Sequence, residues 1–270
     1  MQAAQQLGQK APQEPLRRRI NHFLARTVDR FRVALLVILL AAAAFLAAVV
    51  HASAAESYVL PAPVTGVAGG ARFPGGFQFC PFGWSADGKF AWLESRDIDG
   101  RGGTVYLYVV YDAVEDKEVF THADDSFDWG TEVDATEQES WSRSGNEVSA
   151  GLARYGIVQS PGITMESFPL QKAGDSYTAS LKVKNEPSSE EGEDPIVQSY
   201  SVVLSSRNRG SKVVTTADQV KASRVWIEGY ILSPFEPRVL VVVSVRNRAF
   251  EGYETSHFFY GAHLGLGFRE

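Results

Sequence analysis

An unbroken run of eighteen residues without a charge, from Val33 to Val50, places the strongest constraint on how this chain can fold. As a helix the run would be about 27 Å long at 1.5 Å per residue. That length is close to the hydrocarbon thickness of a bilayer, about 30 Å. A helix on the surface of a soluble core would show a polar face, and this run has none. The sequence therefore predicts one N-terminal transmembrane or signal helix over residues 33–50.

The charge around this segment predicts its orientation. Residues 1–54 carry seven Lys/Arg and two acids, whereas residues 55–270 carry nineteen Lys/Arg and thirty acids, a net charge of −11. Positively charged flanks stay on the cytoplasmic side of a membrane. We therefore expect residues 1–32 to be a basic cytoplasmic tail, and the acidic remainder to lie outside the cytoplasm.

Two fates of the apolar segment are open. Ala52-Ser53-Ala54 is a small-x-small site of the kind that signal peptidase cleaves. Against cleavage, the apolar run is longer than an ordinary signal core and its preceding arm is long. The protein is thus expected either as a single-pass cell-membrane protein with an extracytoplasmic C-terminal domain, or as a secreted or periplasmic protein after cleavage.

Composition argues against several classes of function. A domain with a net charge of −11 would be repelled by phosphate backbones, so nucleic acid is not an expected partner. The same charge opposes binding of the domain to an anionic lipid surface. Cys80 is the single cysteine, so neither an intramolecular disulfide nor a cysteine-based zinc site can form. We expect Cys80 to be buried as a small apolar side chain.

The exported part reads as a linker followed by strands. Residues 51–76 are rich in Pro and Gly and are expected to be a linker. Within residues 77–270, alternation of apolar and polar residues over 177–184 and 199–204 predicts half-buried strands. Val105–Tyr111 and Val239–Val243 are apolar on both faces, which predicts central strands.

No segment after residue 60 shows the 3.6-residue periodicity of a helix, so the expected class is all-β. Two acidic stretches, residues 122–139 and 186–195, are expected to be solvated surface loops.

A turn with a distinctive sequence precedes one predicted strand. Trp84-Ser85-Ala86-Asp87-Gly88-Lys89 contains Asp-Gly, which favours a tight turn because Gly accepts a positive φ. This unit resembles a blade of a TolB-type or WD-like β-propeller. Two weaker copies are Trp141–Asn146, followed by an expected strand at 147–150, and Leu232–Pro237, followed by one at 238–243. The fold is therefore expected to be propeller-like or a β-sandwich.

A second resemblance concerns the C-terminal part. Gly229–Val239 and Arg248-Ala249-Phe250-Glu251-Gly252 resemble the C-terminal signature of a bacterial family of predicted secreted proteins, and Phe82–Trp92 is also similar to that family. These stretches cover about a tenth of the chain. The resemblance implies export and β structure, and it transfers no catalytic residue.

Catalytic motifs are sparse. The exported part has no Gly-x-Ser-x-Gly, phosphate loop or dinucleotide fingerprint. Of its histidines, His257 and His263 would share a face of one strand, although we expect Gly261 to break that strand. Asp97-Ile98-Asp99-Gly100 lacks the later acidic residue of a calcium loop, and a hairpin is expected there. No metal or cofactor is predicted.

Aromatic residues supply the best contact candidates. Tyr106 and Tyr108 fall on the same face of one strand, and they would be binding residues if that face were exposed. The sequence favours an extracytoplasmic binding or scaffold protein, with other envelope proteins as expected partners. The alternative is an envelope hydrolase that uses Ser, His and Asp residues assembled by the fold.

Overall fold

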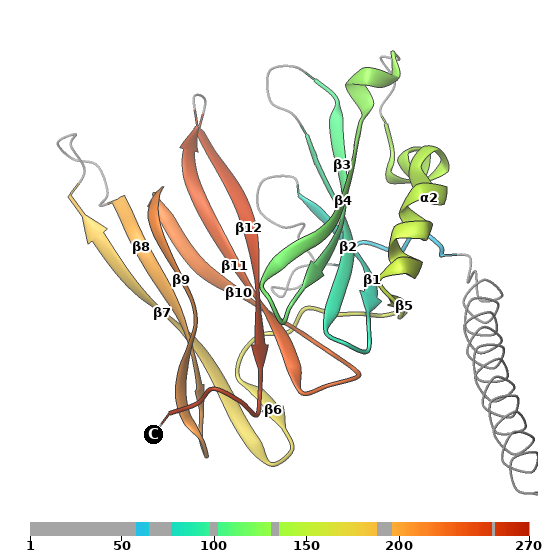
Figure 1. The fold of residues 1–270 in the computed structure, drawn as a ribbon. Helices are drawn as coiled ribbons and strands as arrows, with labels where there is room; N and C mark the ends of the chain where they lie inside the picture. Colours follow the sequence, from blue (N-terminus) through green and yellow to red (C-terminus); the bar gives the residue numbers. More distant parts are fainter. Residues whose placement is uncertain are drawn as a thin grey trace, which may run out of the picture. The chain divides into compact units, whose positions relative to one another are not determined.

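Figure 1 shows the protein as a computed structural model, in which residues 58–64, 77–97, 102–130, 135–187, 196–249 and 252–269 are described. The predicted tail 1–32 and apolar segment 33–50 lie outside these residues. Within the described ranges, no helix combines the length and hydrophobicity needed to cross a bilayer. The described part consists mainly of antiparallel strands, which confirms the all-β prediction at this level.

Three open antiparallel sheets make up the domain. Sheet A has the order β4-β3-β2-β1-β5, with β1 (Gln78–Trp84), β2 (Lys89–Asp97), β3 (Thr104–Asp112), β4 (Lys117–Asp125) and β5 (Val158–Gln159). Sheet B has the order β10-β11-β12, with β10 (Arg224–Leu232), β11 (Arg238–Ala249) and β12 (Gly252–His263). Sheet C has the order β6-β7-β8-β9, with β6 (Leu170–Lys172), β7 (Asp175–Glu186), β8 (Ile196–Ser206) and β9 (Gly210–Ala222).

Sheet B is the middle layer, and β11 explains why. Leu240 and Val242 belong to the cluster shared with sheet A, whereas Val241 and Val243 belong to the cluster shared with sheet C. Successive residues of a strand point to opposite faces, so a strand that is apolar at every position can serve two cores at once. The prediction that Val239–Val243 forms a central strand is confirmed, because β11 pairs with β10 and β12.

Sheet A is also covered on both faces. On β3, Val109 and Tyr111 face sheet B, whereas Tyr108 and Val110 face the long helix α2 (Glu137–Arg154). Figure 1 shows α2 on the side of sheet A that is away from sheet B. In sheet C, Tyr177, Val202 and Leu204 are buried toward sheet B, as their alternation with polar residues predicts.

Helix α2 contradicts the prediction that no helix follows residue 60. Its buried positions have helical spacing: Ser140, Ser144, Val148, Gly151 and Leu152. Because two of these residues are serines and one is glycine, a search for apolar residues alone does not detect the helical period. Thr136 caps the helix, because its side chain accepts from the Glu139 N–H while the Glu139 carboxylate accepts from the Thr136 N–H. This capping box was the available sequence signal for a helix start.

The propeller interpretation is not supported, because the described strands form open sheets of five, four and three strands. The turns that motivated it differ in structure. The first and third copies precede β2 and β11, as expected. Residues 141–150, predicted to be a turn and a strand, lie inside α2.

Parts of the predicted linker and of the predicted acidic loops are ordered elements. The Tyr58 hydroxyl donates to the Ile157 carbonyl at 2.7 Å, and the Val64 N–H donates to the Phe79 carbonyl at 2.8 Å, so residues 58–64 lie against sheet A. The rest of 51–76 is outside the described residues. The stretch 122–139 contains the end of β4, the 3₁₀ helix η1 (Ser126–Trp129) and the start of α2. Most of 186–195 is not described.

Candidate functional site

The two tyrosines predicted as contact residues face the core. Tyr106 and Tyr108 are each 1% exposed, because α2 covers the strand face on which they lie. Burial raises the pKa of Tyr108 to about 12. The Tyr106 ring stacks on Trp129 with centroids 5.8 Å apart, and the Arg143 guanidinium lies 4.5 Å from the centre of the Trp129 ring. The exposure on which their proposed role depended is absent, and both side chains pack between sheet and helix.

A hydrogen-bond network fixes α2 above Tyr108. The Tyr108 hydroxyl lies 2.9 Å from Ser140 Oγ, which donates to Asp124 Oδ2 at 2.9 Å. Asp124 Oδ1 accepts from Trp129 Nε1 at 2.7 Å. These bonds join β3, β4, η1 and α2. Since every group in the network has a partner, its clearest role is to position the helix.

His122 forms a second polar contact between β4 and α2. Its Nε2 lies 3.0 Å from Ser144 Oγ, and its Nδ1 lies 3.3 Å from Glu147 Oε1. The order of atoms matches that of a serine-hydrolase triad. However, Ser144 is 8% exposed and lies in the interior of α2, where the backbone N–H groups are used by the helix itself. Ser144, His122 and Glu147 therefore have the geometry for proton transfer. Because Ser144 lies within the helix, its neighbouring backbone N–H groups are not free to stabilise an oxyanion.

Two other histidines, His257 and His263, lie on β12. Gly261 does not break that strand, which continues to His263, so His257 and His263 share a face. His257 Nδ1 is 2.8 Å from Ser244 Oγ, which donates to Glu228 Oε1 at 2.7 Å. Ser244 is fully buried, so a substrate cannot reach it. His263 Nδ1 instead accepts from the Gly265 N–H, and burial lowers its pKa.

No group of three or more His, Cys, Asp or Glu side chains within the described ranges is arranged to hold a metal ion. Asp99 and Gly100 of the Asp97–Gly100 stretch lie outside those ranges. Cys80 is buried, as predicted, and burial raises its thiol pKa to about 12.

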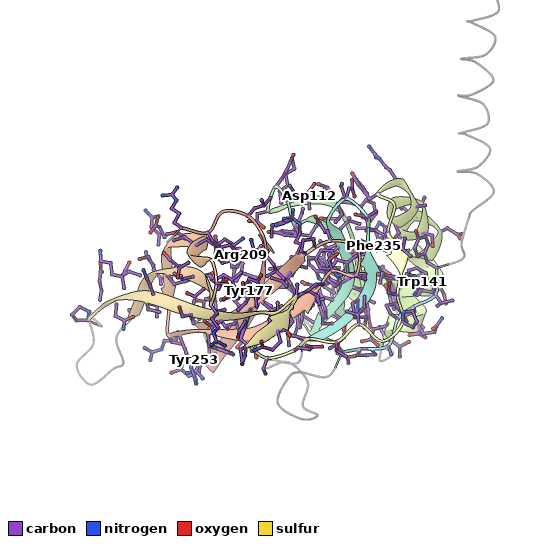
Figure 2. The ribbon with its side chains drawn as sticks, turned by 90° about the horizontal axis from the view of Figure 1, so that it is seen from below. Asp112, Trp141, Tyr177, Arg209, Phe235 and Tyr253 are labelled. Atoms are coloured by element: carbon purple, nitrogen blue, oxygen red, sulfur yellow. The ribbon has the colours of Figure 1, made fainter. Side chains whose placement is uncertain are left out.

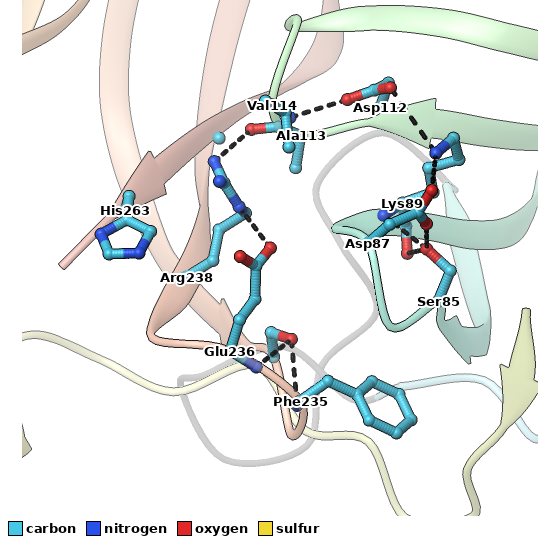
Figure 3. Close-up of polar contacts among 12 residues, drawn as sticks. Ser85, Asp87, Lys89, Asp112, Ala113, Val114, Phe235, Glu236, Arg238 and His263 are labelled. Atoms are coloured by element: carbon cyan, nitrogen blue, oxygen red, sulfur yellow. Dashed lines mark hydrogen bonds and ion pairs between the residues drawn. The ribbon is translucent and has the colours of Figure 1, made fainter. Parts of the chain in front are cut away.

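A polar seam joins the ends of sheets A and B, and it brings together the two segments of the family resemblance (Figure 3). On sheet B, Arg238 Nε donates to Glu236 Oε1 at 2.6 Å, and Arg238 Nη1 donates across to the Ala113 carbonyl at 2.9 Å. On sheet A, Lys89 Nζ lies 2.5 Å from Asp87 Oδ2. We define the polar seam as Ser85, Asp87, Lys89, Asp112, Glu236 and Arg238.

Two glycines allow the sheets to approach each other at the seam. A Cβ on Gly88 would lie 2.5 Å from Glu236 Oε1 and 3.2 Å from Arg238 Nε, and its φ of +88° also favours glycine. A Cβ on Gly261 would lie 1.9 Å from the Ala113 carbonyl oxygen. The Asp-Gly turn seen in the sequence is thus also the place where the turn between β10 and β11 packs.

The turns of the seam are held rigidly. Ser85 Oγ donates to Asp87 Oδ1 at 2.6 Å and accepts from the Lys89 N–H at 2.8 Å. The hydrogen bonds from Lys89 and Ser85 lower the pKa of Asp87. Asp112 Oδ1 accepts from the N–H groups of Val114 and Glu115, at 2.8 and 3.0 Å. These hydrogen bonds therefore fix the backbone of both turns.

Apolar side chains project from this fixed frame. Phe235 is 46% exposed and Val114 is 55% exposed. Ser233 Oγ accepts from the Phe235 and Glu236 N–H groups, at 3.3 and 3.4 Å, which fixes the turn that carries Phe235. In Figure 3 the Phe235 ring points away from the Glu236–Arg238 pair. Sequence reasoning identified this turn as a signature but did not single out Phe235.

Comparisons with protein-family models, with curated proteins and with solved structures find no match.

Proposed function

We propose that this chain is an extracytoplasmic binding or scaffold protein of the cell envelope, and that the polar seam with Phe235 is its contact surface. The observation that carries the proposal is an exposed aromatic ring on a turn fixed by Ser233. Buried aromatic anchors surrounded by polar groups provide much of the binding energy of protein interfaces. A rigid turn also loses little conformational entropy on binding.

The charges of the seam support a protein partner. Glu236 and Arg238 neutralise each other, and Lys89 is paired with Asp87, so the rim of the surface is polar with little net charge. A mixed rim around an apolar centre suits a protein surface better than a highly charged polymer. The export of the domain, and the acidic charge that keeps it from lipid and nucleic acid, make another envelope protein the expected partner.

Site-directed crosslinking tests this proposal. A photoreactive phenylalanine analogue at position 235 of the full chain, expressed in its own cells, should give one discrete crosslinked partner. The matched control is the same analogue at Phe258, which is 43% exposed on β12. The proposal predicts that the Phe235→Arg variant loses the partner in a pull-down. Equal crosslinking from positions 235 and 258, or an unaffected pull-down, would contradict it.

A hydrolase is the second candidate, favoured by the Ser144–His122–Glu147 geometry. In that function Ser144 Oγ would attack an ester or amide carbonyl while His122 takes its proton and Glu147 orients the imidazole. His122 would then give the proton to the leaving alcohol or amine, and water would hydrolyse the acyl-serine to release the acid and restore Ser144. Hydrolysis of activated esters and of cell-wall polymers by the full chain should then fall by orders of magnitude in Ser144→Ala. The control is Ser142→Ala, because Ser142 is exposed on the same helix. Equal rates in both variants would eliminate this mechanism.

A further inference from the structure

The segment that follows β12 is held against sheet C largely through its backbone. We call residues Gly265–Arg269 the strap. Arg209 Nη1 donates to the Gly265 carbonyl at 3.5 Å, and Lys212 Nζ donates to the Leu266 carbonyl at 3.0 Å. Side chains that bond to main-chain carbonyls hold a segment whatever its sequence, as in a site that binds an extended peptide through its main chain.

The end of the strap forms a single β-bridge with the outer strand of sheet C. The Ser211 N–H donates to the Arg269 carbonyl, and the Arg269 N–H donates to the Ser211 carbonyl, each at 3.0 Å. β9 is an edge strand, and beyond this bridge no strand of the described ranges pairs with its free edge. Because alternate residues of a strand point their backbone groups to the same side, Val213 also presents its N–H and C=O to this edge.

The side chains of the strap contribute little to its hold. The centre of the Phe268 ring lies 6.0 Å from that of Tyr177 and 4.8 Å from Lys212 Nζ. Leu266 is instead 64% exposed. Leu264, just before the strap, is buried in the cluster shared by sheets B and C and stays with that core. The strap can therefore open locally without unfolding the domain.

Gly267 explains why the strap uses so little of the β9 edge. Its φ of +81° turns the backbone away from an extended course, so the strap pairs with Ser211 and not with Val213. A Cβ on Gly267 would contact only the Lys212 stem, at 3.6 Å, so a larger residue has room at this position. An extended peptide would pair with both Ser211 and Val213, and Val213 is 60% exposed.

We propose that this edge of β9 binds an extended peptide of a partner protein, antiparallel to β9 and with an aromatic residue in the position of Phe268. The strap is then an internal competitor for the same site. Main-chain pairing with a sheet edge provides affinity, and a pocket for one side chain provides specificity. The site is distinct from the Phe235 surface, because Figure 2 shows Tyr177 and Arg209 together and Phe235 in another part of the domain.

Net charge and local concentration favour a different protein over a second copy as the source of the peptide. Residues 55–270 have a net charge of −11, so two copies repel each other. The strap of a second copy would carry the same Gly267, and it would compete with an internal strap at a far higher effective concentration. A partner peptide without this glycine gains an additional pair with β9.

Fluorescence anisotropy with the full chain in neutral detergent tests the proposal. The probe is a labelled synthetic peptide with the sequence of residues 263–269. Phe268→Ala weakens the strap and leaves the β9 edge intact, so this variant should bind the probe about tenfold more tightly than the unmodified chain does. Phe258→Ala is the matched control, since Phe258 is 43% exposed on β12, and it should change the affinity by less than about twofold.

Changes in the site should act in the opposite direction. In the Phe268→Ala background, Lys212→Gln removes a charged donor and should weaken probe binding about tenfold. Lys184→Gln removes the same charge from an exposed position on β7 and should leave the affinity within about twofold. A probe methylated on the Arg269 nitrogen cannot donate to the Ser211 carbonyl and should also bind about tenfold more weakly.

Other outcomes would overturn the proposal. They are no binding of the probe to Phe268→Ala, or equal binding by this variant and the unmodified chain. If thermal melting shows that Phe268→Ala is unfolded, Arg269→Pro is the second strap variant, because it removes only the N–H that bonds to Ser211 and should also raise the affinity. Dimers of the unmodified chain that Phe268→Ala abolishes would assign the site to exchange of straps between copies. Phe235→Arg should retain probe binding, so failure of this proposal can be distinguished from failure of the Phe235 proposal.

Discussion

The contact between α2 and sheet A differs in kind from the contacts that β11 makes. From Val239 to Val243, β11 is buried through apolar side chains alone, with Leu240 and Val242 on one face and Val241 and Val243 on the other. The first half of α2 is instead anchored by polar pairs, in which Ser140 and Ser144 bond to groups on sheet A. Apolar packing tolerates small shifts, whereas a buried polar network fixes one geometry and loses stability when any member is removed.

The largest expected effect concerns β11. Leu240→Ala should lower the free energy of unfolding by about 2–5 kcal/mol, because the side chain is fully buried between two sheets and leaves a cavity. Urea denaturation of the full chain measures the change. Leu266→Ala is the control, since Leu266 is 64% exposed and should change stability by less than about 0.5 kcal/mol. Similar values for both variants would contradict the layered core.

The polar network should respond strongly to loss of one acceptor. Asp124→Ala removes the acceptor of Trp129 Nε1 and Ser140 Oγ, at a total cost of about 1–3 kcal/mol, because Trp129 is only partly buried and Ser140 keeps its bond to Tyr108. The readout specific to α2 is Cys80, which lies beneath the helix. Its alkylation at pH 8 should be faster in Asp124→Ala. The double variant with Ser140→Ala should be less destabilised than the sum of the single variants, and simple additivity would argue against a connected network.

Alkaline pH offers a way to isolate Tyr108. Burial raises its pKa from 10.0 to about 12, so its contribution to stability is fully present below pH 10 and is lost as the pH rises through 12. Between pH 8 and pH 11 the protein should lose on the order of 1 kcal/mol more stability than Tyr108→Phe does. Urea denaturation at both pH values gives the difference. Equal losses would mean that the hydroxyl is not buried in the folded protein.

The smallest effect is expected at the start of the helix. Thr136→Ala removes the acceptor for the Glu139 N–H and should cost about 1 kcal/mol. Hydrogen exchange should show faster opening of the first turn of α2 while the β11 amides stay protected. Thr178→Ala on the exposed face of β7 is the control for loss of a threonine. Equal exchange rates in the first turn of the unmodified protein, Thr136→Ala and Thr178→Ala would argue against a stabilising role of the Thr136 cap.

The sequence was a good guide where burial is apolar and a poor one where it is polar. Strands β3, β7, β8 and β11 follow from hydrophobic alternation or from apolar runs. Helix α2 does not, because serines occupy buried positions that the pattern expects to be apolar. Helix α2 runs from Glu137 to Arg154, so the capping box at its start was a better signal for this helix than the hydrophobic pattern.

The candidate sites depend on contacts between residues that are far apart in the chain. Gly88 and Arg238 meet across 150 positions, and a single sequence gives no measure of that proximity. Tyr106 and Tyr108 were identified correctly as neighbours on one face, but what covers that face could not be known without α2.

The position of sheet B has a consequence for how the chain matures. Both outer sheets come from residues made earlier, yet the sheet that they share is completed only when β12 has been synthesised. Until then, the aromatic surface of β1 and β2 and the apolar side of β7 and β8 have nothing to cover them. Nascent chains that stall before β11 and β12 have been synthesised should thus be prone to aggregation.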